Sequence, residues 1–441
     1  MTYKRPKILI AGFLLCMAFH LEAQEVRTLT LKDAIELGVK NSKQLQLSKA
    51  RIDEAVAATT EATQRRLPDA SVSANYLRFS NAKVSSYGKD STATSPLGIN
   101  QVIYGTATVS LPVFSGFKIK FGIESAKYLE KAATLDADND RQEVILNVMD
   151  AYVNLYKANI AAKLVEENLA QSRQRDTDFA NLERNGLLAR NDMLTAQLQT
   201  SQFELGLLDA QNQIQLAQVN MNLMLGLPES TKLTLDSASL QAPAQVKTIE
   251  EYEQVAEQNR YDVKALYNRR KAADAAIAAA KGEYYPSVGI SGGYMAADLP
   301  KFITITNAFN AGVGVKYSLS SLWKTDAKVQ QAKARERQVE ASEAMLRDDI
   351  HLAINRAYED YLSGLKKIEV LKKEVDVSTE NYRISQNKYN NSLLTLTDLL
   401  GADVTQLRAK LNLTLAKADA YMSYQTLLQK SGLLTDETIS K

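Results

Sequence analysis

Two aspartates, Asp192 and Asp398, are the residues whose type and placement most readily suggest chemistry. Each stands six residues after a predicted turn, at Gly186 and at Ser392 respectively. A carboxylate close to a helix N-terminus usually caps that helix. The same carboxylate, contributed by several chains around a narrow axis, would instead form a negative ring that attracts cations. The sequence therefore offers either two helix caps or an ion-binding constriction.

The usual catalytic and metal-binding side chains are nearly absent. The chain has two histidines, His20 and His351, and one cysteine, Cys16. It contains no phosphate-binding loop, no nucleophile elbow and no His-Glu-x-x-His motif. Its nine methionines form no cluster with histidine of the kind that binds soft metals. We expect no enzyme, no metal site and no cofactor; a periplasmic enzyme is the alternative with the least support.

The N-terminus has the pattern of a secretory signal peptide, predicted here as residues 1–23. Basic residues precede an apolar run, Ile8 to Phe19, which is too short to cross a bilayer as a helix. A membrane anchor is the alternative. Leu15 before Cys16 is not a small residue, which argues against lipid attachment. The charge of the whole chain is balanced, with 53 basic and 51 acidic residues, and gives no reason to expect nucleic acid.

The elements that must position the two aspartates belong to an internal duplication. Residues 29–76 match residues 247–294 at a shift of 218, and residues 109–226 match residues 315–432 at a shift of 206. The period is far too long for a solenoid repeat. The predicted organisation is a first repeat at 24–227, a linker or equatorial segment at 228–248, a second repeat at 249–432 and a short tail at 433–441.

Each repeat predicts the order helix, β-hairpin, long helix, helix. In the first repeat the expected ranges are a helix at 31–66, a hairpin at about 70–114 with a polar loop at 80–104, and helices at 117–184 and 191–225. In the second they are a helix at 249–283, a hairpin at about 286–319, and helices at 323–390 and 398–430. A helix of about 68 residues is roughly 100 Å long. Near-heptad apolar spacing predicts that such helices pack as coiled coils.

The strands alternate between an apolar and a small or polar face, as strands in a membrane barrel do. The residues predicted to face lipid are Val72, Ala74, Tyr76, Val109, Leu111, Val113, Val288, Ile290, Tyr294, Val313, Val315 and Tyr317. A bilayer does not tolerate an open sheet edge, and four strands cannot close a barrel. Several chains would therefore share one barrel. A soluble four-stranded sheet with one wet face is the alternative.

The chain resembles the TolC-type outer membrane efflux family. The resemblance rests on the duplication, the Leu67-Pro68 and Tyr285-Pro286 junctions, the stop at Leu225-Gly226-Leu227-Pro228 and the helical turns. It implies an α+β membrane protein. Three chains, with four strands each, would form a 12-stranded β-barrel in the cell outer membrane, continuous with a long periplasmic α-helical barrel. It also implies an export duct of a tripartite efflux or type I secretion-like system.

The implied partners are further copies of the chain as a homotrimer, a periplasmic adaptor (membrane fusion) protein, an inner-membrane pump and outer membrane lipid. The resemblance assigns adaptor docking to the two turns, here Asn185, Gly186, Leu187, Leu188, Ser392, Leu393 and Leu394. A secreted coiled-coil structural or adhesion protein without a pore is the alternative. It would explain the helices but not the four alternating strands.

The resemblance also implies a gate at the periplasmic tip, where a Tyr and an Arg of the second turn hold an Asp of the first. Tyr389 and Asp192 match this pattern, but Leu394 stands in the place of the Arg. The family's closely spaced acidic pair matches only at Asp398, because Gly401 replaces the second acid. Asp403 and Arg190 are the candidates to replace the missing groups.

Overall fold

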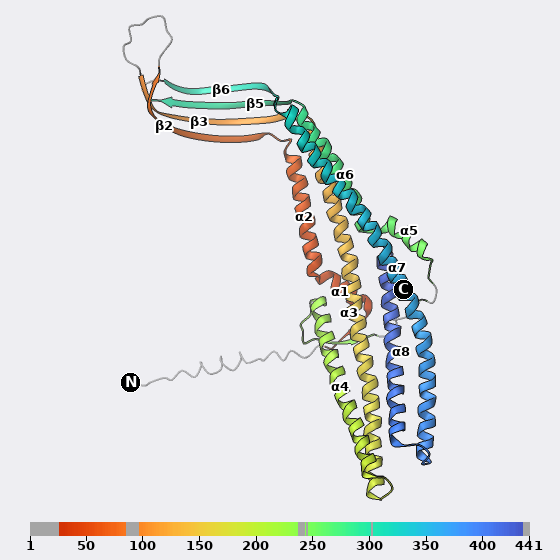
Figure 1. Ribbon diagram of the computed structural model, residues 1–441. Coiled ribbons are helices and arrows are strands. Elements are labelled where there is room, and N and C mark those ends of the chain that lie inside the picture. Colours follow the sequence, from red (N-terminus) through yellow and green to blue (C-terminus); the bar gives the residue numbers. More distant parts are fainter. Residues whose placement is uncertain (1–25, 85–96, 237–242, 244–245, 301–302, 435–441) are drawn as a thin grey trace, which may run out of the picture. The chain divides into compact units, whose positions relative to one another are not determined.

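The computed structural model describes residues 26–84, 97–236, 243, 246–300 and 303–434 (Figure 1). The expected signal peptide and residues 435–441 of the tail lie outside these ranges. The first half contains β1 (Val26–Leu29), α1 (Leu31–Asn41), α2 (Lys43–Gln64), β2 (Asp69–Val84), β3 (Leu97–Phe114), α3 (Lys118–Arg184) and α4 (Arg190–Leu225). The second half contains β4 (Lys232–Leu235), α5 (Ile249–Asn259), α6 (Tyr261–Lys281), the 3-10 turn η1 (Gly282–Tyr284), β5 (Ser287–Leu299), β6 (Ile303–Lys316), α7 (Ser321–Asn390) and α8 (Leu396–Lys430).

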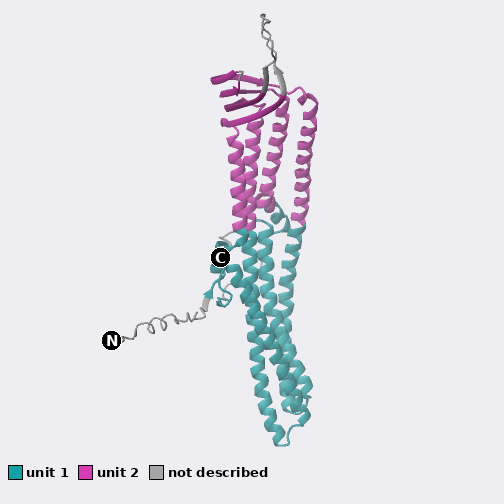
Figure 2. Cartoon of the chain, turned by 90° about the vertical axis from the view of Figure 1, so that its left-hand side faces the viewer, with its two compact units in different colours: residues 1–45, 141–255, 352–441 teal, residues 46–140, 256–351 magenta. Residues whose placement is uncertain are grey.

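The chain divides into two compact units (Figure 2). Unit 1 comprises residues 1–45, 141–255 and 352–441, and unit 2 comprises residues 46–140 and 256–351. Each unit therefore takes residues from both copies of the sequence repeat. The long helices α3 and α7, of 67 and 70 residues, contribute to both units. Within the described residues, no helix combines the length and the apolar character that crossing a membrane requires.

The prediction of single helices at 31–66 and 249–283 is wrong, because each segment is interrupted about one third of the way along, at Ser42 and at Arg260. Ser42 has an extended backbone after α1, and its hydroxyl accepts a hydrogen bond from the Leu45 N–H at 3.3 Å, which starts α2. The Asn41 side chain donates to the Leu225 carbonyl at the end of α4, at 2.6 Å. Arg260 has the same extended conformation between α5 and α6. At Ser42, side-chain capping therefore overrides helix propensity, whereas Arg260 caps α6 without a side-chain hydrogen bond.

A short parallel strand pair, β1 with β4, was not predicted. β4 lies within the segment expected to be a linker, and Leu29 and Leu233 of the two strands are buried. The buried Tyr152 of α3 donates its hydroxyl to the Leu29 carbonyl at 3.1 Å and to the Asp236 carbonyl at 2.7 Å. These contacts connect the strand pair to the core of unit 1, which α1, α3, α4 and α8 also build.

Unit 2 carries an antiparallel four-stranded sheet in the order β2-β3-β5-β6 (Figure 1). The polar loop expected at 80–104 is wrong at both ends, since β2 continues to Val84 and β3 begins at Leu97. Strand pairing satisfies backbone N–H and C=O groups whatever the side chains are, so polar residues do not end a paired strand. Tyr76 and Tyr104 consequently lie inside strands rather than near their ends.

Candidate functional site

The sheet has one predominantly apolar face. The register pairs Val72 with Ala107, Ala107 with Tyr294 and Tyr294 with Phe309, so these residues share a face. The same face carries the expected residues Val72, Ala74, Tyr76, Val109, Leu111, Val288, Ile290, Tyr294, Val313 and Val315. Val113 lies at the bulge before Phe114, and Tyr317 follows the end of β6. Several of these side chains are largely exposed, such as Val72 at 85% and Val313 at 71%.

The opposite face of the sheet is small and polar. Ser73 and Thr106 are hydrogen-bonded there at 2.8 Å, and Gly293 lies too close to the Ala107 carbonyl to carry a side chain without a shift. The edge strands β2 and β6 each pair with one neighbour among the described residues. A soluble sheet normally buries its apolar face and keeps its polar face in water. This sheet leaves its apolar face open and both of its edges free.

The first predicted turn joins α3 to α4. Gly186 is in the left-handed conformation at φ 72°, and its N–H donates to the Glu183 carbonyl at 2.9 Å. The Leu187 N–H donates to the Leu182 carbonyl at 2.9 Å. This pair of bonds is a Schellman ending, which requires a positive φ and therefore favours glycine.

The second turn, between α7 and α8, has the same geometry although serine replaces glycine. Ser392 has φ 56°, and its N–H donates to the Tyr389 carbonyl at 2.9 Å. The Leu393 N–H donates to the Lys388 carbonyl at 2.8 Å. A residue with a side chain in this conformation costs roughly 1 kcal/mol. The two turns are therefore equivalent in shape and unequal in backbone strain.

Tyr389 and Asp192, from the two different turns, lie close to each other. The pKa of Tyr389 is raised because the ring is partly buried and because the Asp192 carboxylate lies nearby, while Arg175 acts in the opposite direction. The Tyr389 ring packs against Phe179 with the ring centres 5.9 Å apart. Tyr389 also borders a small cluster of buried residues, Phe179, Met193, Ala196, Leu396 and Leu400. The structure thus places Tyr389 beside a cluster to which α4, the helix that carries Asp192, contributes Met193 and Ala196.

The other expected gate residues have different partners. Asp398 accepts from the Thr395 hydroxyl at 2.6 Å, while its own N–H donates to the Thr395 oxygen at 3.2 Å, so it forms part of the cap of α8. Asp398 remains exposed. Arg190 is paired with Glu183 at 3.4 Å, across the first turn, and is also exposed. Arg190 therefore does not contact Tyr389 in this structure, and Gly401 opens onto empty space.

Asp403 is buried and paired with Arg175 of α3. The Arg175 Nη2 to Asp403 Oδ2 distance is 2.6 Å, and the side chains are only 12% and 2% exposed. The remaining atoms Arg175 Nη1 and Asp403 Oδ1 are buried without a hydrogen-bond partner. Burial and the Asp403 carboxylate also raise the pKa of the neighbouring Tyr382. Asp403 is therefore directed into the contact between α3 and α8.

This ion pair was not predicted, although the repeat contains a signal for it. The residues that match Arg175 and Asp403 in the other copies are Asn381 and Gln197, neither of which is charged. A charge that is present in only one copy of a duplicated helix points to a contact specific to that copy.

Both turns expose a leucine at their outermost part. Leu187 is 74% exposed and Leu393, the matching residue of the second turn, is 75% exposed. The neighbouring residues Asn185, Gly186 and Ser392 are also exposed, whereas Leu188 and Leu394 are partly buried. Single exposed apolar side chains are common on protein surfaces, so what distinguishes these two leucines is their equivalent placement on the two turns.

The exposed apolar residues of unit 1 concentrate on two of its long helices. On α4 they are Leu194, Leu198, Leu205, Leu208, Leu216 and Leu223, and on α7 they include Leu352, Val370, Val377 and Ile384. The other two helices face each other: Lys157 of α3 binds Asp419 of α8 at 2.7 Å, in addition to the Arg175–Asp403 pair. The α4 and α7 stripes have near-heptad spacing, which is typical of helices that pack against another helix.

Comparisons with known proteins agree with this architecture. Residues 34–227 and 253–433 match the family model described as outer membrane efflux protein. The outer membrane efflux protein BepC of Brucella suis biovar 1 (strain 1330) is 23% identical over 460 residues, which cover 99% of this chain and 93% of BepC. The outer membrane protein VceC of Vibrio cholerae has a TM-score of 0.73 and 20% identity, covering 91% of this chain and 96% of VceC. The open state of the outer membrane channel MtrE of Neisseria gonorrhoeae has a TM-score of 0.70 and 16% identity, covering 91% and 89% of the two chains.

Proposed function

The chain belongs to the outer membrane efflux protein family, and from that premise we propose that three copies form a duct that exports molecules from the periplasm to the outside. The family consists of channels and not enzymes, in agreement with the sparse catalytic side chains. The observation that carries the proposal is the sheet of unit 2, whose apolar face is exposed and whose two edges are free. The outer membrane is the location that this family and this sheet favour.

Closure of a barrel would satisfy both unusual features of the sheet at once. Edge-to-edge pairing of β6 in one chain with β2 in the next would remove the unpaired backbone groups, which are costly in lipid. Three chains with four strands each give 12 strands, within the range of known membrane barrels. The apolar residues, such as Val72 and Val313, would then face lipid, and the small polar face would line the lumen.

The helices of unit 1 also favour contacts between neighbouring chains. Because α3 and α8 are bonded within the chain, the free apolar stripes of α4 and α7 are available for a neighbouring chain. Leu205 lies 15 residues after Arg190, the first residue of α4, and Val377 lies 13 residues before Asn390, the last of α7. The two stripes therefore occur at similar heights above their turns. Pairing α4 of one chain with α7 of the next would close a ring of helices.

We propose a gate where the two turns meet, formed by Tyr389, Asp192 and Asp398. Three copies of the exposed Asp398 around the axis would form a negative ring that favours cations. Tyr389 packs beside the cluster that contains Met193 of α4, and the Asp192 carboxylate next to Met193 helps to raise the pKa of Tyr389. The buried Arg175–Asp403 pair connects the other two helices, α3 and α8, and it removes Asp403 from the proposed ring.

The proposed partners are a periplasmic adaptor and an inner-membrane pump, since the chain offers no site for an energy-supplying reaction within its described residues. The exposed Leu187 and Leu393 are the proposed anchors for the adaptor. A few well-packed residues near the centre of an interface commonly dominate its affinity. The identity of the transported molecules would be set mainly by the pump, because a passive duct discriminates little.

Single-channel conductance in planar bilayers tests the proposal. Purified protein should insert as a trimer whose migration on a gel changes on boiling, and it should conduct after insertion. Asp398→Asn should lower the preference for cations over anions, while Asp403→Asn should leave that preference unchanged because Asp403 is buried. A secreted coiled-coil protein without a pore would remain monomeric or form helical oligomers and would give no conductance. Absence from the outer membrane fraction would also count against the duct.

A further inference from the structure

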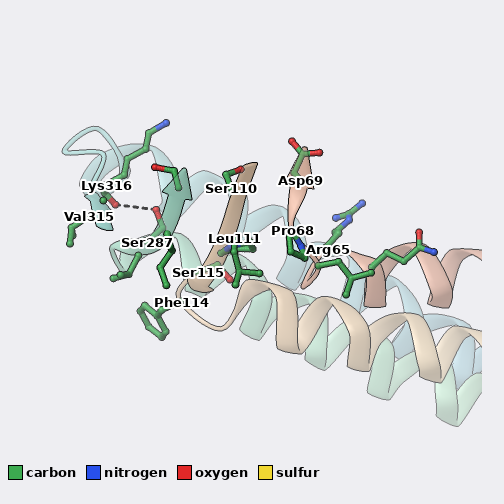
Figure 3. Close-up of a pocket in the computed structure, with 18 of the residues that line it drawn as sticks. Arg65, Pro68, Asp69, Ser110, Leu111, Phe114, Ser115, Ser287, Val315 and Lys316 are labelled. Atoms are coloured by element: carbon green, nitrogen blue, oxygen red, sulfur yellow. Dashed lines mark hydrogen bonds between the residues drawn. The ribbon is translucent and has the colours of Figure 1, made fainter. Parts of the chain in front are cut away.

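A cavity of about 780 Å³ lies in unit 2, where the sheet meets the end of α2 (Figure 3). The size is typical of a pocket for a small molecule. It is lined on one side by strand residues of β3, β5 and β6 and on the other by the last turn of α2 and the Leu67-Pro68 junction. Every lining residue belongs to unit 2.

The strand side of this cavity belongs to the apolar face of the sheet. Leu111, Phe114 and Val315 extend toward the side on which the helices lie, whereas Asp69, Ser110 and Lys316 point the other way (Figure 3). Val288 and Ile290 complete the apolar lining and share the face with Val315 and Leu111. The wall of the cavity therefore continues the surface that the proposed function assigns to lipid.

The helix side of the cavity is polar and carries a guanidinium group. Arg65 directly follows α2 and lies beside Pro68, with its guanidinium extending toward the side of Asp69 (Figure 3), and it is largely exposed. Its Nη2 donates to Glu61 at 3.0 Å, and its other guanidinium nitrogens have no partner among the described residues. An exposed pair of this kind contributes little to folding and can exchange its partner readily. Arginine binds phosphate oxygens in a bidentate manner, which suits an anion at this position.

Aromatic rings flank the apolar wall on the same side. Phe114 stacks edge to face on Phe117 at 5.2 Å, and Phe117 stacks on Tyr285 at 6.5 Å. Phe117 adopts φ 66°, an unusual conformation for a bulky residue, and its ring stays 51% exposed. Partly exposed aromatic rings at the end of a membrane strand are placed where acyl chains give way to head groups.

We propose that this cavity binds one glycerophospholipid, with its acyl chains along the apolar wall and its phosphate on Arg65. The assignment rests on the proposed function, because it requires the apolar face to be in a membrane. A phospholipid is the proposed occupant because one side of the cavity is apolar, as acyl chains require, and the other carries the Arg65 guanidinium, which can bind a phosphate. A second copy of the chain would pair at the strand edges, whereas the cavity lies against the face.

Native mass spectrometry of the delipidated full-length protein in non-ionic detergent tests the proposal. The probes are phosphatidylglycerol, a diacylglycerol with the same acyl chains, and inorganic phosphate. Phosphatidylglycerol should be retained at one molecule per chain, the diacylglycerol should bind at least about tenfold more weakly, and phosphate should not compete at millimolar concentration. Arg65→Glu should weaken retention of phosphatidylglycerol by about tenfold or more. Arg66→Glu is the matched control, since Arg66 is adjacent but does not line the cavity.

A second pair of variants addresses the apolar wall. Leu111→Ser, inside the cavity, should weaken retention, while Val72→Ser, on the same face but outside the cavity, should not. If the diacylglycerol is retained as well as phosphatidylglycerol, the site is rejected in favour of nonspecific lipid binding. The same holds if Arg65→Glu and Arg66→Glu weaken retention of phosphatidylglycerol equally. Conductance is measured in parallel and should be unchanged by Arg65→Glu. Retention without any conductance in the wild type would reject the duct alone, and conductance without Arg65-dependent retention would reject the lipid site alone.

Discussion

The buried pair between Arg175 and Asp403 gives the sharpest test of how the helices of unit 1 are held together. Asp403→Asn keeps the shape of the side chain and removes its charge. The Arg175 guanidinium, only 12% exposed, would then have no counter-charge. Breaking a buried pair in this way typically destabilises a protein by about 3–5 kcal/mol. For a domain of the size of unit 1, each kcal/mol shifts the unfolding midpoint by roughly 2–4 °C.

The double variant Arg175→Met/Asp403→Leu should behave differently from the single one. Two buried atoms of the pair, Arg175 Nη1 and Asp403 Oδ1, have no hydrogen-bond partner even in the intact protein. The pair therefore never recovers its full desolvation cost, and replacing both residues by apolar ones of similar volume should be close to neutral or stabilising. We therefore expect the double variant to be at least as stable as the wild type. Both single variants should be much less stable than the wild type.

Thermal unfolding followed by circular dichroism in detergent, with a double-mutant cycle, measures this coupling. The Lys157–Asp419 pair is the matched control, because it joins the same two helices but its carboxylate is 55% exposed. Asp419→Asn should cost no more than about 1 kcal/mol. The reasoning fails if Asp403→Asn costs as little as Asp419→Asn, or if the double variant is as unstable as the sum of the single ones.

Three further outcomes follow from the structure. Ser392→Gly should raise the free energy of unfolding and Gly186→Ala should lower it, each by roughly 1 kcal/mol, since both positions require positive φ; the same sign for both changes would contradict this. Burial raises the pKa of Tyr152 to about 12, against about 10 in the unfolded chain. The contribution of the neutral Tyr152 to the free energy of unfolding is therefore complete below pH 10 and is lost as the pH rises through 12. Stability measured from pH 9 to pH 12 should therefore fall more steeply in the wild type than in Tyr152→Phe, and equal slopes would refute the assignment. Leu205→Cys and Val377→Cys, expressed as separate single variants in one cell, should form a disulfide between chains under oxidation if α4 packs on α7 of a neighbour; a gel without that dimer would reject this contact.

Much of the helical layout could be predicted from the sequence. The Asn185-Gly186 pair marks the end of α3, and Gly226 followed by Pro228 marks the end of α4, because a left-handed residue and a proline both stop a helix. Alternation in the strands identified the residues that share the apolar face, since a period of two leaves little freedom in orientation. The Ser392 turn was found through the repeat even though its residue is unfavourable for that conformation.

The remaining features depend on partners that are distant in the sequence. The break at Ser42 is stabilised by Asn41 reaching the end of α4, and the strand pair of β1 and β4 joins segments some 200 residues apart. The contact of Arg175 with Asp403 likewise spans 228 residues. Local propensity and periodicity carry no information on such pairings. Strand length was underestimated for a related reason, because neighbouring strands extended β2 and β3 through polar residues.

The two kinds of helix contact in unit 1 have a mechanical consequence. Within a chain, the charged contacts between α3 and α8 fix one helix against the other in a single register, because a displacement of one turn would separate Arg175 from Asp403. The free stripes of α4 and α7 carry leucine, valine and isoleucine, whose non-directional contacts can form again after a shift of one heptad. In a ring of three chains, stiff and compliant joints would then alternate. The helices of unit 1 in each chain would move as a nearly rigid group. A change in the inner diameter of the ring would be accommodated by sliding at the contacts between chains.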